Sequence, residues 1–168
     1  MLFRRQPTDR DIFETVLGRF VVAGNSRRPL EKHPDPDYQV LYGFDVTPCC
    51  IPLASVAWLN TKTPGLFLRT TIGHAKDRRA AERAAALITA INYPLPAGAF
   101  ALNVADGEVL FKNALYFGSA SLNEPLVSGL LEPSFEFVSM YWQDVLEAIL
   151  GSEGPAHSHP LSAPPGAA

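Results

Sequence analysis

Histidine and cysteine are the side chains best suited to nucleophilic catalysis or metal binding, and this chain has few of either. They are His33, His74, His157, His159 and the adjacent pair Cys49 and Cys50. A catalytic thiol needs a histidine folded beside it, and a structural zinc site needs about four ligands. Nothing in the spacing indicates either arrangement. We therefore expect no metal, no cofactor and no catalytic residue.

His74 is the best of these residues as a general base, because Asp77 follows closely and could orient the ring. A solvated histidine at the end of a strand is the simpler interpretation. The acidic residues are spread over predicted loops and helix surfaces, and the glycines do not form a phosphate-binding loop. An enzyme that uses His74 or Cys50 is therefore the least favoured hypothesis.

Two groups of basic residues raise the question of nucleic acid. They are Arg27, Arg28 and Lys32, and then Lys76, Arg78, Arg79 and Arg83. Such groups bind phosphates when they share a face with aromatic side chains. Asp77 and Glu82 partly neutralise the second group, and the chain has 14 basic against 17 acidic residues. A nucleic-acid-linked regulator that uses the basic start of the second helix is the alternative hypothesis, and direct binding is not expected.

The composition indicates one folded domain. The chain has 168 residues, of which 47% are hydrophobic and 18% are charged, so it can bury a core. No apolar run approaches the roughly 20 residues of a membrane span, and the N-terminus lacks the apolar centre of a signal peptide. We expect a cytoplasmic protein without membrane contact, with a single domain over residues 1–151 and a disordered Pro/Ala-rich tail over 152–168.

Hydrophobic periodicity places the secondary structure. It predicts helices over 9–20, 77–92, 121–131 and 134–150, and strands over 38–46, 51–60 and 66–73. Thr8 with Asp11 and Ser121 with Glu124 are typical of capping boxes, and Pro133 separates the last two helices. The run 51–60 is apolar on both faces, which favours a strand covered on both sides.

Two further strands form a hairpin between Gly98 and Phe117. Asp106-Gly107 is typical of a two-residue type I′ turn. That turn predicts Val104 opposite Val109 and Leu102 opposite Phe111. The element order is then helix, three strands, helix, two strands and a broken helix, so the predicted fold is α+β with a five-stranded antiparallel sheet.

Apolar surface is the remaining candidate for function. The first helix carries Ile12, Phe13, Val16 and Phe20, which we expect to contact a partner protein. In the second helix, Leu87, Ile88 and Ile91 belong either to the core or to a dimer interface. The sheet adds Leu41, Leu110, Ala114 and Tyr116 as candidates for an exposed apolar face. The predicted helices are few for two sheet faces. Two alternatives stay open: part of this surface meets another chain, or the helices cover all of it.

The stretch from Ala86 to Phe117 resembles the YbjN family of bacterial proteins. In that family a helix closes on asparagine, as at Asn92, and a hairpin of the form G-x-F-x-L-x-x-x-x-G-x-V follows. Its positions correspond here to Gly98, Phe100, Leu102, Gly107 and Val109. The resemblance covers about Leu66 to Leu150, and 1–62 fits in element order only.

The YbjN family is similar in fold to the homodimeric chaperones of type III secretion. The resemblance therefore implies a non-catalytic, chaperone-like homodimer that holds a segment of a partner protein and has a regulatory role. In such proteins the first helix and the sheet commonly contact the partner. The leading hypothesis is thus a protein-binding module that holds its partner in an apolar groove or adds it to a sheet edge.

Overall fold

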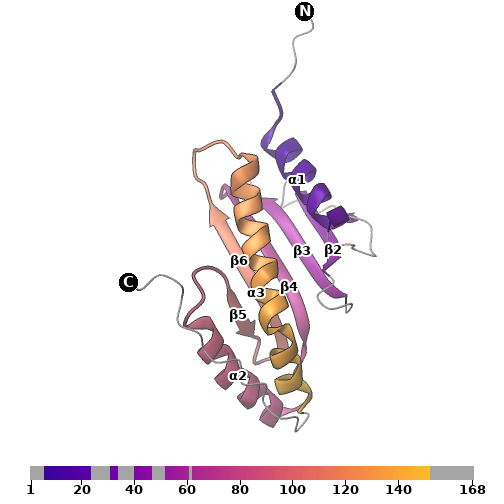
Figure 1. Cartoon of the computed structure of the whole chain (residues 1–168), viewed down its shortest axis with the longest axis vertical. Helices are drawn as coiled ribbons and strands as arrows, with labels where there is room; N and C mark the ends of the chain where they lie inside the picture. The colour runs from indigo at the N-terminus through magenta and orange to yellow at the C-terminus, as the bar shows by residue number, and fades with distance from the viewer. Residues whose placement is uncertain (1–5, 24–30, 34–39, 47–51, 61, 152–168) are drawn as a thin grey trace, which may run out of the picture.

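The computed structural model describes residues 6–23, 31–33, 40–46, 52–60 and 62–151 (Figure 1). The elements are α1 (Asp9–Ala23), β1 (Glu31–His33), β2 (Val40–Val46), β3 (Leu53–Asn60), β4 (Gly65–His74), α2 (Arg78–Asn92), β5 (Ala99–Leu102), β6 (Glu108–Tyr116) and α3 (Glu124–Leu150). The α+β class and the predicted order are confirmed. The tail predicted to be disordered lies outside the described residues.

One antiparallel sheet forms the centre of the fold, with the strand order β1-β2-β3-β4-β6-β5. All five predicted strands are present. The three-residue β1, which pairs with β2, adds a sixth strand at one edge. The sequence did not predict β1, because Glu31–His33 is polar and lies in a polar stretch with several prolines, so its pairing depends on the tertiary fold.

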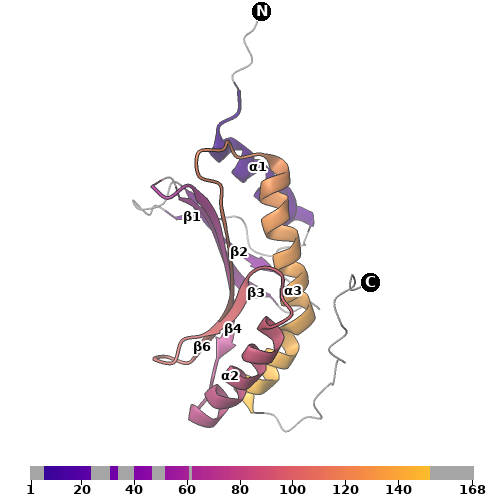
Figure 2. The ribbon, with the colours of Figure 1, turned by 90° about the vertical axis from the view of Figure 1, so that its left-hand side faces the viewer.

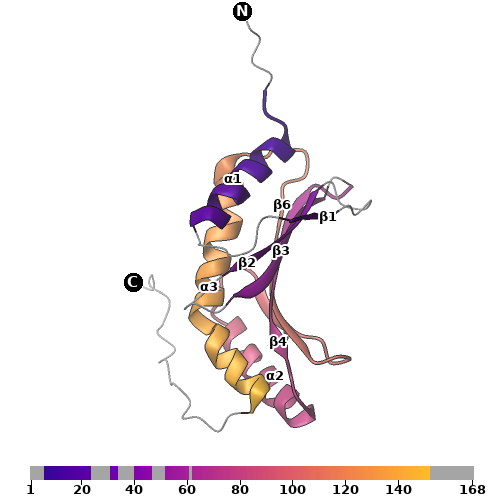
Figure 3. The same cartoon turned by 90° about the vertical axis from the view of Figure 1, so that its right-hand side faces the viewer.

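Within the described part of the chain, the three helices cover one face of the sheet and leave the other uncovered (Figures 2 and 3). α3 runs along the covered face, with α1 beside its first half and α2 beside its second half (Figure 1). In both side views the ends of the sheet project away from the helical layer. The uncovered face is therefore concave.

α3 is one continuous helix, so the predicted break at Pro133 is wrong. Its buried residues form a single stripe: Val127, Leu130, Leu131, Ser134, Phe135, Val138, Trp142, Val145 and Ile149. A proline inside a helix costs about 3 kcal/mol, and packing on both sides of Pro133 offsets that cost. Asn123, not Ser121, caps the N-terminus, because its side chain accepts a hydrogen bond from the Leu126 amide at 3.0 Å.

The β5–β6 hairpin has a longer loop than the two-residue turn that the sequence predicted. Leu102 pairs with Val109 and Phe100 with Phe111, so the predicted register is wrong by two residues. The Asn103 carbonyl accepts from the Gly107 amide at 2.8 Å, and Gly107 has a positive φ of +78°. The loop is thus built on an α-turn. A shift of two keeps each side chain on its predicted face.

A polar seam divides the covered side into two apolar clusters. One contains Phe13, Leu17, Leu59, Leu66 and Leu131 with α1, and the other contains Ile88, Phe100, Phe111, Val145 and Ile149 with α2. Between them the Ser55 and Thr70 hydroxyls lie 2.9 Å apart, and Asn113 Nδ2 donates to Ser134 Oγ at 2.9 Å. These hydrogen bonds satisfy the polar groups that the fold buries there.

Candidate functional site

Three aromatic side chains form a row across the uncovered face of the sheet. Trp58 on β3 stacks on Phe67 of β4, with ring centroids 5.2 Å apart and an interplanar angle of 8°. Phe67 meets Tyr116 of β6 edge to face at 5.4 Å. Tyr116 is 63% exposed, although its ring is large and apolar. We call Trp58, Phe67 and Tyr116 the aromatic row.

Charged side chains lie beside the aromatic row, toward the middle of the same face. Arg69 on β4 forms an ion pair and hydrogen bonds with Glu108 of β6, to which Thr71 Oγ1 also donates at 3.2 Å. Lys112 is directly opposite Arg69 in the sheet register and is exposed. No ion pair of Lys112 is found among the described residues. The middle of the face therefore carries two cations and one carboxylate.

The face combines apolar and cationic character in a concave surface. Leu110 and Ala114, predicted with Tyr116 to lie on an exposed sheet face, alternate along β6 with the buried Val109 and Phe111. Leu41 is a residue whose side chain the structure does not describe. Trp58 is not among the predicted site residues, because the apolar pattern of 51–60 on both faces favours a strand covered on both sides. That pattern is the signal that could have found Trp58. Phe67 lies in the neighbouring predicted strand 66–73, where it alternates with the buried Leu66 and Leu68.

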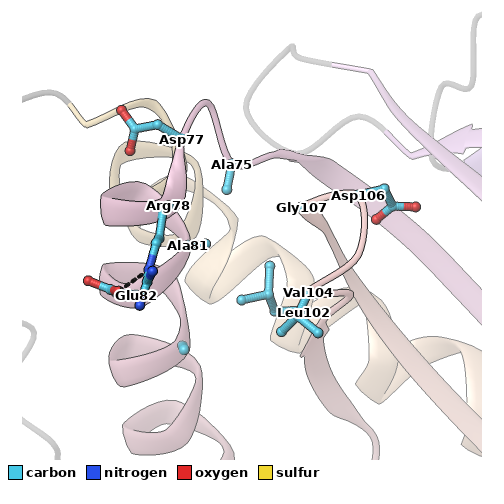
Figure 4. Close-up of a pocket in the computed structure, with 10 residues that line it drawn as sticks. Ala75, Asp77, Arg78, Ala81, Glu82, Leu102, Val104, Asp106 and Gly107 are labelled. Atoms are coloured by element: carbon cyan, nitrogen blue, oxygen red, sulfur yellow. Dashed lines mark hydrogen bonds and ion pairs between the residues drawn. The ribbon is translucent and has the colours of Figure 1, made fainter.

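A groove with a volume of about 580 Å³ lies between α2 and the tip of the hairpin (Figure 4). Ala81 and Ala85 line the helix side, and Leu102 and Val104 line the hairpin side. Val104 is 89% exposed, which contradicts its predicted cross-strand position in the hairpin. The polar groups at the rim are already engaged, because Arg78 pairs with Glu82 at 3.0 Å and Asp77 caps α2.

The residues of α1 that were predicted to bind a partner pack into or against the core. Phe13 is 0% exposed and Val16 is buried, while Ile12 and Phe20 are partly buried against the same apolar cluster. The helical stripe of α1 points at the sheet and α3, because burying it there stabilises a short helix. In this fold the α1 stripe is therefore not an open surface, and the candidate surface moves to the other side of the sheet.

The predicted set on α2, which is Leu87, Ile88 and Ile91, also packs against the core. Ile88 and Ile91 are buried and Leu87 packs partly against the α2-side cluster. These side chains therefore pack within the single chain, and a dimer interface that uses α2 stays a prediction. The alanines of α2 allow this close packing, since Ala80 and Ala84 are fully buried.

Among the described residues, His74 and Asp77 do not form a catalytic pair, whereas Lys76 and Arg83 of the second basic group both lie beside Gly151. His74 is exposed at the end of β4, and the Asp77 carboxylate accepts a hydrogen bond from the Ala80 amide instead of orienting the histidine. Arg78 is paired with Glu82, and Arg83 donates to the Ala148 carbonyl at 3.3 Å. Cys49, Cys50, Arg27 and Arg28 lie outside the described residues, as do His157 and His159.

The described part of the chain contains neither a group of metal ligands nor a helix that could span a membrane. No group of three or more His, Cys, Asp or Glu side chains there could hold a metal ion. None of the helices in that part of the chain has the length and apolar character of a bilayer span.

One ionisable side chain has a distinctly altered acidity. Tyr42 Oη donates to Glu14 Oε1 at 2.5 Å, and Arg10 Nε donates to the same oxygen at 2.7 Å. Burial of the phenol, and then the hydrogen bond to Glu14, raise the pKa of Tyr42 to about 12. The Glu14 carboxylate also raises the pKa of Arg10. These contacts join α1 to β2 and lie on the covered side, so they serve the fold rather than the candidate surface.

No protein-family model matches this chain, and no curated protein matches its sequence. Solved structures with a similar fold include a chain from the crystal structure of the ExsC-ExsE complex. It is 11% identical, with a TM-score of 0.51 over 84% of this chain and 97% of that chain. Another is an uncharacterized protein from Methanothermobacter thermautotrophicus, with 11% identity and a TM-score of 0.49 over 82% of this chain and 99% of that one. The first likeness supports the predicted chaperone-like fold, whereas membership of the YbjN family stays a prediction.

Proposed function

We propose that this protein is a non-catalytic binding module that holds a segment of a partner protein on the uncovered face of its sheet. The observation that carries the proposal is the aromatic row on a concave surface, in which Tyr116 is exposed and Trp58 and Phe67 are half-buried. Aromatic residues in such a setting supply most of the binding energy at protein interfaces. The fold likeness to a chain crystallised in the ExsC-ExsE complex is consistent with a role in holding another protein.

The shape and charge of the face favour another protein over a second copy of this chain. Two identical concave faces leave a gap between them, because a concave surface is filled by a convex one. A two-fold contact would also bring Arg69 and Lys112 toward their own copies, which is unfavourable. We propose a convex partner segment, such as the apolar side of a helix, that carries a carboxylate opposite Lys112.

The proposal also includes three properties of the protein: it forms a homodimer, as the sequence resemblance implies, it is cytoplasmic, and it has a regulatory role. If the concave face binds the partner, the dimer uses another surface. Light scattering of the purified chain measures its oligomeric state directly. A monomer at micromolar concentration removes the dimer from the proposal without affecting the binding face.

The binding face is tested by crosslinking from defined positions. A photoreactive amino acid is placed at position 58, 116 or 93 in separate variants. The protein that crosslinks to each variant is identified by mass spectrometry, and it is then purified for affinity measurements. Tyr93 is the matched control, because it is an aromatic residue that is 93% exposed outside the sheet. We expect crosslinks from positions 58 and 116 and none from position 93. A crosslink to a second copy of this chain instead would contradict the proposed occupant.

Affinity then tests the aromatic row itself. We expect Trp58→Ala to weaken binding of the purified partner by about 30-fold, the equivalent of an interface hot spot of about 2 kcal/mol. Lys112→Glu should weaken binding as well, with an effect that shrinks at high salt. Tyr93→Ala should change nothing. Equal affinity of the Trp58→Ala protein and the unmodified protein for the partner would overturn the proposal.

A further inference from the structure

The side chain of Asn92 is bonded to the edge of the sheet. β5 is the edge strand next to β6. Asn92 Nδ2 donates to the Phe100 carbonyl at 2.8 Å, and the Phe100 amide donates to Asn92 Oδ1 at 2.8 Å. The backbone carbonyl of Asn92 in turn accepts a hydrogen bond from the Leu95 amide at 3.3 Å. The carboxamide is thus held in place at the end of α2.

This pair of hydrogen bonds has the pattern of an antiparallel strand pair. In such a pair one residue gives its amide proton and accepts with its carbonyl from a single partner residue. A side-chain carboxamide has the same donor and acceptor groups as a backbone peptide. Asn92 therefore satisfies the outward-facing groups of Phe100 as a neighbouring strand would.

Little of the edge stays open beyond Phe100. The Asn103 amide donates to the Glu108 carbonyl, so by alternation Ala101 and Ala99 also turn their backbone groups toward β6. Only Leu102 in β5 shares the outward direction of Phe100, and it borders the groove next to α2. A single outward residue is too short to template another strand, whereas Phe100 and Leu102 together would offer two consecutive pairings.

We propose that Asn92 acts as a substitute strand that closes the β5 edge to other chains. It prevents pairing between two copies of this protein through β5. It also excludes partner segments from that edge, which directs them to the concave face; this second part rests on the proposed function. Asn92 is then a residue that determines binding specificity without touching the partner.

The proposal is tested by replacing Asn92 and measuring self-association. We expect Asn92→Ala to raise the hydrogen-exchange rate of the Phe100 amide at least tenfold and to produce concentration-dependent oligomers in sedimentation velocity. Asn92→Asp keeps the acceptor but loses the donor and should give an intermediate result. Thr89→Ala, a change at an exposed position of the same helix, is the control and should behave like the unmodified protein.

A second change separates edge closure from a merely structural role. Ala101 lies on β5 with its side chain on the uncovered face, and a lysine on an edge strand opposes strand addition. The double variant Asn92→Ala, Ala101→Lys should return to the original oligomeric state while Phe100 exchange stays fast. Unchanged association of Asn92→Ala and Asn92→Asp, or oligomers that persist in the double variant, would overturn the proposal. Neither readout involves the partner, so failure here is distinct from failure of the binding face.

Discussion

The Tyr42 phenol shows how a single side chain ties the first helix to the sheet. It contacts Phe13 of α1, with ring centroids 6.2 Å apart, and donates to Glu14 one position further along the same helix. The carboxylate also accepts from Arg10, so one acidic residue satisfies two donors. The hydrogen bond from the buried Tyr42 phenol to this charged carboxylate contributes about 1.5–3 kcal/mol.

The acidity of Tyr42 provides a test of this contact. Its pKa is raised from 10.0 to about 12, first by burial and then by Glu14. We expect Glu14→Gln to lower the pKa of Tyr42 while leaving it above 10, because burial persists. Ultraviolet titration, taken as the difference from the Tyr42→Phe protein in each background, measures this value. Glutamine can still accept the phenol proton, so an unchanged pKa in the Glu14→Gln protein would show that the charge of Glu14 has no effect on Tyr42.

The same shift gives a dependence of stability on pH. The folded state holds the Tyr42 proton more tightly than the unfolded state, so the contribution is fully present below pH 10. It is lost as the pH rises from 10 toward about 12. The free energy of unfolding of the unmodified protein should therefore fall more steeply over that range than that of the Tyr42→Phe protein.

Among the elements, α3 departs most from what local sequence signals predict. Pro133 is a strong local signal for a break, and Glu132-Pro133 reads as the end of a helix. The stripe from Val127 to Ile149 continues in phase across it, however, and long-range packing decides the outcome. Pro133 removes the amide that would bond to the Gly129 carbonyl, and Gly129 is exposed, so water can satisfy that carbonyl.

Replacing this proline tests the balance. We expect Pro133→Ala to raise the free energy of unfolding by up to about 3 kcal/mol, because alanine restores the hydrogen bond and favours the helix. Chemical denaturation measures the change, and Glu132→Ala at the neighbouring exposed position is the control. A loss of stability would mean that the sheet and helices pack only against a helix shaped by proline.

The sequence predicts the elements well where short-range patterns decide their ends. The binding surface could not be predicted in this way, because it depends on contacts between residues far apart in the sequence. The Thr8 and Asp11 capping box, the Asp77 cap and the end of α2 at Asn92 are all present as predicted. Which apolar face stays open could not be predicted, because α1 and β3 both carry apolar residues. The choice depends on how α1 and α3 meet the sheet.

At the scale of the whole molecule, the polar seam separates two packing units that share one helix. The first half of α3 completes the cluster around Phe13 and Leu17, and its second half completes the cluster around Phe100 and Ile149. Pro133 and Ser134 lie where α3 passes from one cluster to the other. Two substitutions affect each other's energetic cost when the side chains share contact partners. Few apolar side chains contact both clusters across the polar seam, so we expect the two clusters to be nearly independent.

Double-mutant cycles test the separation of the two units. Leu17→Ala should cost about 2–5 kcal/mol and Ile149→Val about 0.5–1.5 kcal/mol. Their costs should add to within about 0.5 kcal/mol, since the two residues lie in different clusters. Phe100 and Phe111 have ring centroids 5.1 Å apart in one cluster, so Phe100→Leu with Phe111→Leu should show coupling. Strong coupling across the seam would contradict the division.

The polar seam also bears on how such a chain can change over generations. The aromatic row lies at the end of β3, β4 and β6 whose covered side belongs to the cluster around Leu59 and Leu66, whereas Asn92 closes the sheet beside the other cluster. Substitutions in the aromatic row, and in the packing beneath it, should therefore leave the stability of the β5 edge almost unchanged. The aromatic row can therefore change its binding specificity over evolution while the β5 edge stays closed to self-association.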